Sequence, residues 1–419
     1  MKDDSLIFRE PSLQIRAPIT RMNWLLINLF VVLGPLGNLL TPQLISHAFR
    51  SYYLVLLLFP LLYSCFYRWQ AAILVACLPY FLYSLASAIW FPHHEFTSRE
   101  VLFRFFLLFS QFLFVLGASS HFTSFHEVKK LILRYVKSVF LSVLVGYCFY
   151  LGFSFKFFSL SLLEKFSVLT QMGYGFLRFS PGSYPNEYGT ITSFTLAVTA
   201  LIAQKNLFSS KKILYFFYCL TLGALLLTTT KAAYLSYLGS LLYLWWKDKR
   251  SLAVVVIPCV VIFCVALILS FFHLNAFAVL SIGFPMRILE LPSIEERMLF
   301  WKIALEEWKS HLWFGHGFSY YSNLHNLYLQ LLCEMGLVGS CVLAMAFFLS
   351  LRGEEGYWRI KKQLSEEEEL VRKIVHVGLI HVLWFGLSNH NLNHHLTWFT
   401  LLLCFSLRAL YQCEKKKVG

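Results

Sequence analysis

The sequence predicts an all-α membrane protein, a polytopic bundle of transmembrane helices. Hydrophobic residues make up 58% of the 419 residues, and mean hydropathy is +0.62. Only 14% of the residues are charged, whereas soluble domains carry roughly 25%. The apolar residues form long runs without the strict alternation of a transmembrane β-barrel. These features exclude a cytosolic enzyme, a disordered protein and a secreted disulfide scaffold.

Apolar runs recur along the whole chain, and a run of about 20 apolar residues is needed to cross a bilayer as a helix. We therefore expect about 12 spans in a single integral membrane domain, 1–419. The predicted spans are 24–40, 51–67, 69–91, 101–118, 135–155, 189–204, 212–229, 231–246, 251–272, 336–351, 373–389 and 394–413.

The distribution of Lys and Arg orients these spans. If both termini are cytoplasmic, 24 of the 36 cations fall in cytoplasmic segments and 10 in outer segments, as the positive-inside rule requires. This asymmetry accounts for the net charge of +14, so we expect a lipid bilayer and no nucleic acid as partner. The first apolar run follows a polar segment and precedes no small-residue cleavage site, so we expect no cleavable signal peptide.

The longest outer segment, 273–324, predicts an amphipathic helix. A capping box at Ser293–Glu296 marks its start. Such a helix lies at the membrane interface or packs on the bundle. Its apolar residues recur in steps of three and four at Ile294, Met298, Trp301, Leu305, Trp308 and Leu312.

A second helical pattern follows His325 and Asn326. Ser322 or Asn323 is the expected cap, which places His325 in the first helical turn. The positive end of a helix favours neutral imidazole, and a neutral imidazole can accept a proton from a hydroxyl nucleophile. The alternative is a polar residue at the membrane interface. The pattern consists of Tyr328, Leu331, Leu332 and Met335.

Two outer cations stand apart from the inward-biased majority. Arg178 lies in the irregular outer segment 156–188, where its guanidinium could bind a phosphate in a bidentate fork. The alternative is a snorkelling arginine paired with a carboxylate such as Glu187. Lys231 interrupts an apolar run at an outer turn and is either a phosphate ligand or a simple turn lysine.

The remaining polar clusters of the sequence are not predicted to form metal or catalytic sites. Three histidines lie within 389–395, but no carboxylate or cysteine supports a metal site there, so a polar turn or hydrogen bonding to a sugar is favoured. The acidic run 366–369 predicts a solvated helix face. The ten cysteines lie mostly in apolar runs without a CxxC pair, as expected of small core residues.

The region from Glu296 to Gly339 resembles the signature region of the O-antigen ligase and O-antigen polymerase superfamily. The resemblance rests on Glu296-Arg-Met-Leu-Phe-Trp-Lys-Ile-Ala-Leu, on His-Leu-Trp-Phe-Gly-His-Gly-Phe, and on His325-Asn-Leu-Tyr-Leu-Gln followed by Gly336-Leu-Val-Gly339. A weaker resemblance covers 174–190. The predicted topology agrees with it.

The resemblance implies a metal-independent membrane glycosyltransferase of the bacterial inner membrane, with its active site facing the periplasm and without a cofactor. The implied donor is a glycan linked to undecaprenyl diphosphate. A ligase of this type transfers the glycan to a sugar hydroxyl of lipid A-core, and a polymerase transfers it to another carrier-linked repeat unit. Segment 273–335 would be the main periplasmic catalytic loop, and 156–188 a second periplasmic loop.

The resemblance also implies roles for individual residues. The implied catalytic residues are His325, Arg297 and Arg178, and the family's Ser-Arg-Gly is replaced here by Thr230-Lys231-Ala232. A lysine keeps the charge of that arginine but lacks its bidentate fork. The residues expected to bind substrate are Lys231, Asn326, Arg287 and His316, and no metal ligand is expected.

An O-antigen ligase is the leading functional hypothesis. A repeat-unit polymerase of the same superfamily is the first alternative, and a protein O-oligosaccharyltransferase is a further one. A lipid or solute transporter is disfavoured, because transporters place charges near the membrane midplane, often in paired halves. Here the span centres carry almost no charge and the halves show no evident similarity.

Overall fold

The computed structural model describes residues 13–40, 71–90, 97–166, 168–171, 177–204, 210–249, 255, 292–321, 324–351, 365–387, 389, 392 and 394–418. These residues form helices and one two-stranded antiparallel sheet. The elements are α1 (Leu13–Leu40), α4 (Ala71–Trp90), α5 (Ser98–Ser119), α6 (Phe125–Ser154), α7 (Leu160–Lys165), β1 (Leu169–Gln171), β2 (Leu177–Phe179), α8 (Pro185–Gln204), α9 (Lys211–Thr228), α10 (Lys231–Lys247), α13 (Pro292–Ser310), α14 (Leu327–Leu351), α16 (Glu366–Gly386) and α17 (His395–Val418).

The helical fold class is confirmed within these residues. Ten of the twelve predicted spans fall on helices, and 51–67 and 251–272 lie outside the described residues. Four helical segments are long and apolar enough to cross a membrane, namely Ser98–Ser119, Phe125–Ser154, Leu327–Leu349 and His395–Cys413. The chain is therefore a multi-pass membrane protein, whereas the number of spans and the side on which the termini lie stay predictions.

Several helices begin where a hydroxyl side chain caps the backbone. Thr97 and Glu100 form a capping box at the start of α5, which satisfies two backbone donors that the helix leaves without a partner. Ser124 caps α6 by accepting from the Glu127 N–H, and Ser365 caps α16 by accepting from the Glu368 N–H. These caps fix the boundaries between helices and polar joints.

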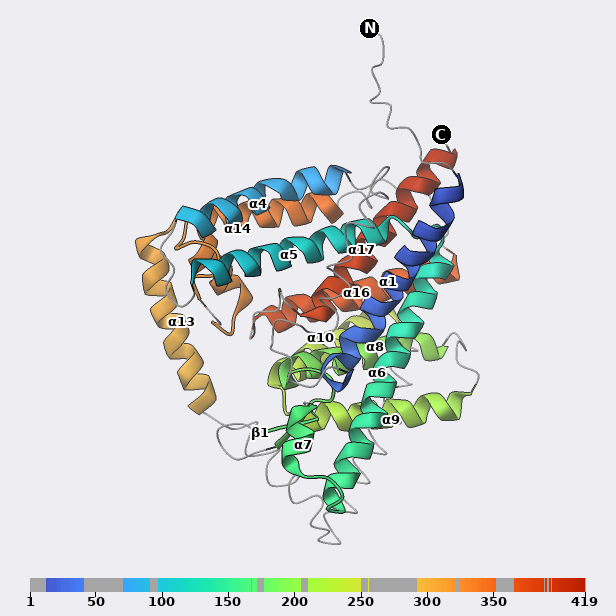
Figure 1. Ribbon diagram of the computed structural model, residues 1–419. Helices are drawn as coiled ribbons and strands as arrows, with labels where there is room; N and C mark the ends of the chain where they lie inside the picture. Colours follow the sequence, from blue (N-terminus) through green and yellow to red (C-terminus); the bar gives the residue numbers. More distant parts are fainter. Residues whose placement is uncertain are drawn as a thin grey trace.

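Helix α8 lies at the centre of the array and packs on α9, α10 and α16. Tyr188, Ile191 and Phe194 on α8 are fully buried. Helices α4 and α14 run side by side, and α1 runs along α6 (Figure 1). In the same view α13 stands at the left edge, while the end of α17 lies at the upper right.

Helix α14 is kinked at Gly336, whose φ of +62° and ψ of −170° are not helical. A Cβ at this position would lie 2.3 Å from the Trp313 carbonyl oxygen, so only glycine permits this close approach. The expected span at 336–351 is thus the second part of a longer helix that begins at Leu327.

The predicted outer segment 156–188 is more regular, where it is described, than the sequence indicated. It contains the short helix α7 and the hairpin of β1 and β2, in which Thr170 is paired with Arg178. Proline and glycine signals predicted a loop, but tertiary packing orders these residues: Leu163, Leu169 and Phe179 are all buried.

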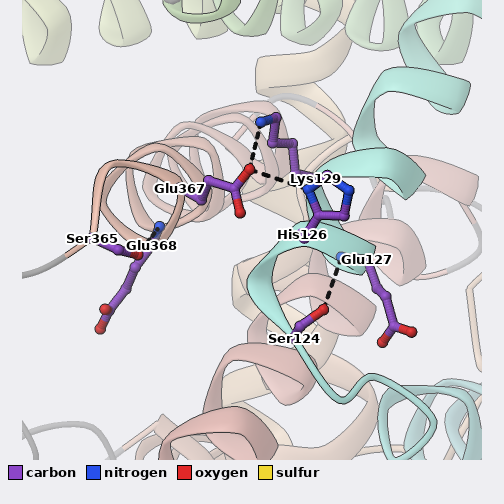
Figure 2. A network of polar contacts seen from close by, with 7 residues as sticks. All are labelled: Ser124, His126, Glu127, Lys129, Ser365, Glu367 and Glu368. Atoms are coloured by element: carbon purple, nitrogen blue, oxygen red, sulfur yellow. Dashed lines mark hydrogen bonds and ion pairs between the residues drawn. The ribbon is translucent and has the colours of Figure 1, made fainter.

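The expectation of a solvated acidic face at 366–369 is wrong for part of the run. Glu368 is completely buried. Glu367 accepts hydrogen bonds from Lys129 Nζ at 2.6 Å and from His126 Nδ1 at 3.2 Å, both on α6 (Figure 2). The acidic run therefore joins α16 to α6, in addition to placing negative charge at the positive end of α16.

Candidate functional site

The start of α14 is formed by Asn326 and His325. The Asn326 side-chain oxygen accepts a hydrogen bond from the Leu329 N–H at 3.0 Å, so Asn326 caps the helix. His325 lies just outside the helix rather than in its first turn as expected. Ser322 and Asn323, the predicted caps, lie outside the described residues.

His325 is half-buried and held in an uncommon backbone conformation. Its φ is +53°, in the left-handed region, which costs free energy for a residue with a Cβ. Its Nδ1 lies 3.4 Å from the side-chain oxygen of Asn389, which follows α16. The conformation thus turns the imidazole toward the end of another helix.

Burial is the main cause that lowers the pKa of His325, and the nearby guanidinium of Arg297 lowers it further. The hydrogen bond with Asn389 and the charge of Glu296 act in the opposite direction. The direction agrees with the neutral imidazole that the sequence predicted. The cause differs: the sequence predicted that the positive end of the helix favours neutral imidazole, whereas in the structure burial is the main cause.

Arg297 lies on α13, and burial lowers the pKa of its guanidinium, opposed by Glu296. Among the described residues, helix α13 packs on the chain by one edge: Ala304 is buried together with Leu324, Leu329 and Cys333. Trp301 donates from Nε1 to the Leu324 carbonyl at 2.9 Å. This contact fixes α13 against the segment that leads to His325.

The other side of α13 is exposed and largely apolar. Met298, Leu299 and Ile303 are 60%, 58% and 46% exposed. Of the predicted apolar stripe, Trp301 and Trp308 face the chain, while Met298 and Leu305 do not. One edge therefore packs on the bundle, which is one of the two predicted alternatives, whereas a position at the membrane interface stays a prediction.

The connection from α13 to α14 is held by a buried carboxylate. Glu334 accepts from the N–H groups of Ser319 at 3.1 Å and Tyr321 at 3.3 Å, and from Gln330 Nε2 at 2.8 Å. Arg104 Nη1 donates to the Ser319 hydroxyl at 3.4 Å. Arg104, which lies on α5, thus contacts this connection.

Two glycines allow that connection to cross the kink in α14. Gly315 and Gly336 both have positive φ, and a Cβ on Gly315 would lie 2.5 Å from the Glu334 carbonyl. Backbone hydrogen bonds join Leu312 to Leu337 and Trp313 to Val338. The Gly315–Gly317 part of the resemblance is thus needed for packing.

Arg178 lies in a second cluster, formed by the hairpin, α8 and the joint between α9 and α10. Its Nε donates to the Thr228 carbonyl at 2.6 Å, and its Nη2 donates to Asn186 Oδ1 at 2.9 Å and Thr230 Oγ1 at 2.6 Å. The side chain is buried. Glu187, the predicted alternative partner, accepts from the Ser183 hydroxyl and from the His395 N–H.

Lys231 is the first residue of α10 and is half-buried. Thr230 precedes it as N-cap but makes no side-chain capping bond, because its hydroxyl accepts from Arg178 and donates to the Pro185 carbonyl. The positive end of α10 therefore retains its attraction for an anion next to the Lys231 ammonium.

The other three residues predicted to bind substrate are His316, Arg287 and Asn326. His316 Nε2 contacts the Glu307 carbonyl at 3.1 Å, and its ring stacks on Tyr320, so His316 faces its own loop. Arg287 lies outside the described residues. Asn326 is engaged as the cap of α14.

Of the three histidines within 389–395, His394 and His395 are described, and His390 lies outside the described residues. Among the residues that the structure describes, no group of three His, Cys, Asp or Glu side chains could hold a metal ion. His395 is buried, with its Nε2 2.9 Å from the Phe30 carbonyl. Sequence reasoning missed the contact of Asn389 with His325, for which the polar composition of this turn was the only signal.

Residues 216–344 match the O-Antigen ligase family. This segment contains Lys231, Arg297, His316, His325 and Asn326, whereas Arg178 precedes it. No curated protein matches the chain.

The family match confirms the resemblance to the O-antigen ligase and polymerase superfamily. It supports a membrane glycosyltransferase of the O-antigen ligase type in broad terms. The matched segment extends from α9 into α14, which contains one of the four long apolar segments. The family match and the apolar helices therefore both indicate a membrane protein.

Proposed function

We propose that the protein is an O-antigen ligase that transfers a polysaccharide from undecaprenyl diphosphate to a sugar hydroxyl of lipid A-core. The reaction takes place at the periplasmic face of the bacterial inner membrane. The observation that carries this proposal is that the charge of Arg297 acts on His325, with both residues in the segment that matches the O-antigen ligase family. A proton acceptor next to a fixed cation suits displacement of a diphosphate.

In the proposed reaction, the acceptor hydroxyl oxygen attacks the anomeric carbon of the carrier-linked sugar. The bond from that carbon to the phosphate oxygen breaks, and its electron pair leaves with the diphosphate. The hydroxyl proton passes to His325. The products are the glycosylated acceptor and undecaprenyl diphosphate, and a single displacement inverts the anomeric centre.

The cations act on the leaving diphosphate, where negative charge develops. We assign the direct contact to Arg297, because its charge acts on His325. Lys231 is the second candidate, since its ammonium lies at the positive end of α10. Arg178 positions Thr230 and thereby Lys231 through its hydrogen bonds.

No metal or nucleotide sugar takes part in the proposed reaction. The donor already contains an activated glycosyl–diphosphate bond, and protein cations supply the positive charge. Transfer is therefore expected to proceed in the presence of a chelator.

The test uses the purified protein in lipid nanodiscs, with undecaprenyl-diphosphate-linked glycan as donor and lipid A-core as acceptor. We expect transfer with and without EDTA, and a loss of about 10²–10⁴-fold in kcat for His325→Ala. His126→Ala is the matched control, because His126 is an exposed histidine on α6 that contacts Glu367. Both variants should keep the wild-type unfolding temperature.

Three results would contradict parts of the proposal. Transfer to a carrier-linked repeat unit in place of lipid A-core would identify a polymerase. Loss of transfer with EDTA that Mg²⁺ restores would refute metal independence. Full transfer by His325→Ala would remove the proposed proton acceptor.

A further inference from the structure

Asn389 lies outside the α13–α14 region, and its side chain is hydrogen-bonded to His325. It follows α16 and is buried, with 4% of its surface exposed. The distance from its Oδ1 to His325 Nδ1 is 3.4 Å. Its position in a turn rich in histidine and asparagine gave no reason to single it out.

The chemistry of the two groups fixes the direction of this hydrogen bond. An amide oxygen only accepts hydrogen bonds, so the proton lies on Nδ1 of His325. A neutral imidazole carries one ring proton, and its other nitrogen then keeps a lone pair. Nε2 is therefore the basic nitrogen.

The surroundings hold this arrangement in place. The Tyr328 hydroxyl donates to the Leu383 carbonyl at 2.8 Å, and Gly386 lies against Leu327. The end of α16 is thus docked on the start of α14. The positive φ of His325 is a further constraint, and strain of this kind concentrates at functional sites.

We propose that Asn389 is a positioning residue that holds His325 in the tautomer with a basic Nε2. This inference rests on the proposed function of His325. By analogy with the carboxylate that orients a catalytic histidine, Asn389 selects the tautomer and the ring orientation without touching the substrate. Its neutral amide does so without adding a negative charge that would favour the imidazolium.

The charged groups that face His325 from α13 are Arg297, which disfavours the imidazolium, and Glu296, which favours it. A carboxylate at position 389 would add a second group that favours the imidazolium. Removal of the amide would have the opposite effect, because its hydrogen bond raises the pKa of His325. The two substitutions therefore shift the titration of His325 in opposite directions.

The experiment measures transfer from undecaprenyl-diphosphate-linked glycan to lipid A-core as a function of pH for Asn389→Ala and Asn389→Asp. For Asn389→Ala we expect kcat to fall about 10–100-fold, with the acidic limb of the kcat/KM profile at lower pH. For Asn389→Asp we expect the acidic limb at higher pH and most of the activity recovered on its alkaline side.

Tyr328→Phe is the matched control, because it removes another hydrogen bond at the same helix junction without touching His325. We expect it to keep the wild-type pH profile. In the double variant His325→Ala, Asn389→Ala, the loss should not exceed that of His325→Ala alone, because Asn389 acts through His325.

The outcomes separate this inference from the proposed function. If His325→Ala abolishes transfer but Asn389→Ala keeps the wild-type rate and profile, Asn389 has no positioning role and the function of His325 stands. If Tyr328→Phe reproduces the loss of Asn389→Ala, docking of the helices and not the tautomer is responsible. If His325→Ala retains full transfer, the proposed function of His325 fails first.

Discussion

Arg178 and Arg297 are the same residue type, and the resemblance assigns both to catalysis, but their surroundings differ. Arg178 is 8% exposed, and its donors bond to a backbone carbonyl, an amide and a hydroxyl from two other parts of the chain. Arg297 lies on an amphipathic helix that packs by one edge, and its charge acts on His325.

The difference separates two uses of a guanidinium. Arg178 joins the hairpin to α8 and to the α9–α10 joint, so its hydrogen bonds contribute to the fold. Arg297 is close to a proton acceptor, where a charge acts on the reacting groups. We therefore expect Arg178 to control stability and Arg297 to control rate.

The largest expected effect belongs to Arg297. For Arg297→Ala we expect kcat to fall about 10²–10³-fold, since the cation that stabilises the leaving diphosphate is lost. The unfolding temperature should stay close to that of the wild type. Arg297→Lys keeps the charge and should recover part of the rate. A wild-type rate for Arg297→Ala would show that Arg297 does not control the rate.

Arg178 provides the converse test. Removal of its side chain leaves the Thr228 carbonyl and the Thr230 hydroxyl without their charged donor, so Arg178→Ala should lower the free energy of unfolding by about 2–3 kcal/mol. Unfolding in detergent measures this loss. Arg178→Lys should recover less than half of it, because a single ammonium cannot reproduce the fork. Unchanged stability together with lost transfer would assign Arg178 to the reaction itself.

The pH dependence of transfer tests whether the charge of Arg297 acts on His325. The proposed active form of His325 is neutral, and burial and Arg297 lower its pKa from 6.5. The fall of wild-type kcat/KM as the imidazolium forms should therefore be centred below pH 6.5. Arg297→Ala removes one of the lowering causes and should move this fall to higher pH. A profile that Arg297→Ala leaves in place would show that the two groups are not coupled.

The smallest effect is expected at the ion pairs between α6 and α16, where Glu367 contacts Lys129 and His126 (Figure 2). The pair is partly exposed, so Glu367→Gln should cost at most about 1 kcal/mol of unfolding free energy. The Lys129 hydrogen bond lowers the pKa of Glu367 below 4.5, so its contribution is present above pH 4.5 and is lost as pH falls further. Transfer should be unaffected; a clear loss of transfer would connect this region to the site.

Composition and periodicity predicted the parts of the fold that depend on local sequence. The joint at Thr229–Lys231 and the helix that follows His325 are found where the patterns placed them. The hairpin at Arg178 was missed, because strands of three residues carry little local signal and are ordered by burial of Leu169 and Phe179.

For the site, the sequence supplied the residue types but not the partners. The His325 motif was visible because its glycines and histidine are close in sequence. Asn389 and Arg104 could not be assigned to the site, since they come from remote segments, and Glu334 could not be distinguished from a solvated acid. Periodicity describes one helix at a time and says nothing of which helix ends meet.

By itself, the sequence determined that this chain is an apolar helical membrane protein with an O-antigen ligase segment. That followed because span length and hydropathy are local properties. Only the tertiary structure decided which of the predicted outer cations acts on His325, which one is bonded within the fold, and which remote side chain contacts the histidine. Those properties depend on distances between segments that are far apart in the chain, and packing of whole helices sets such distances.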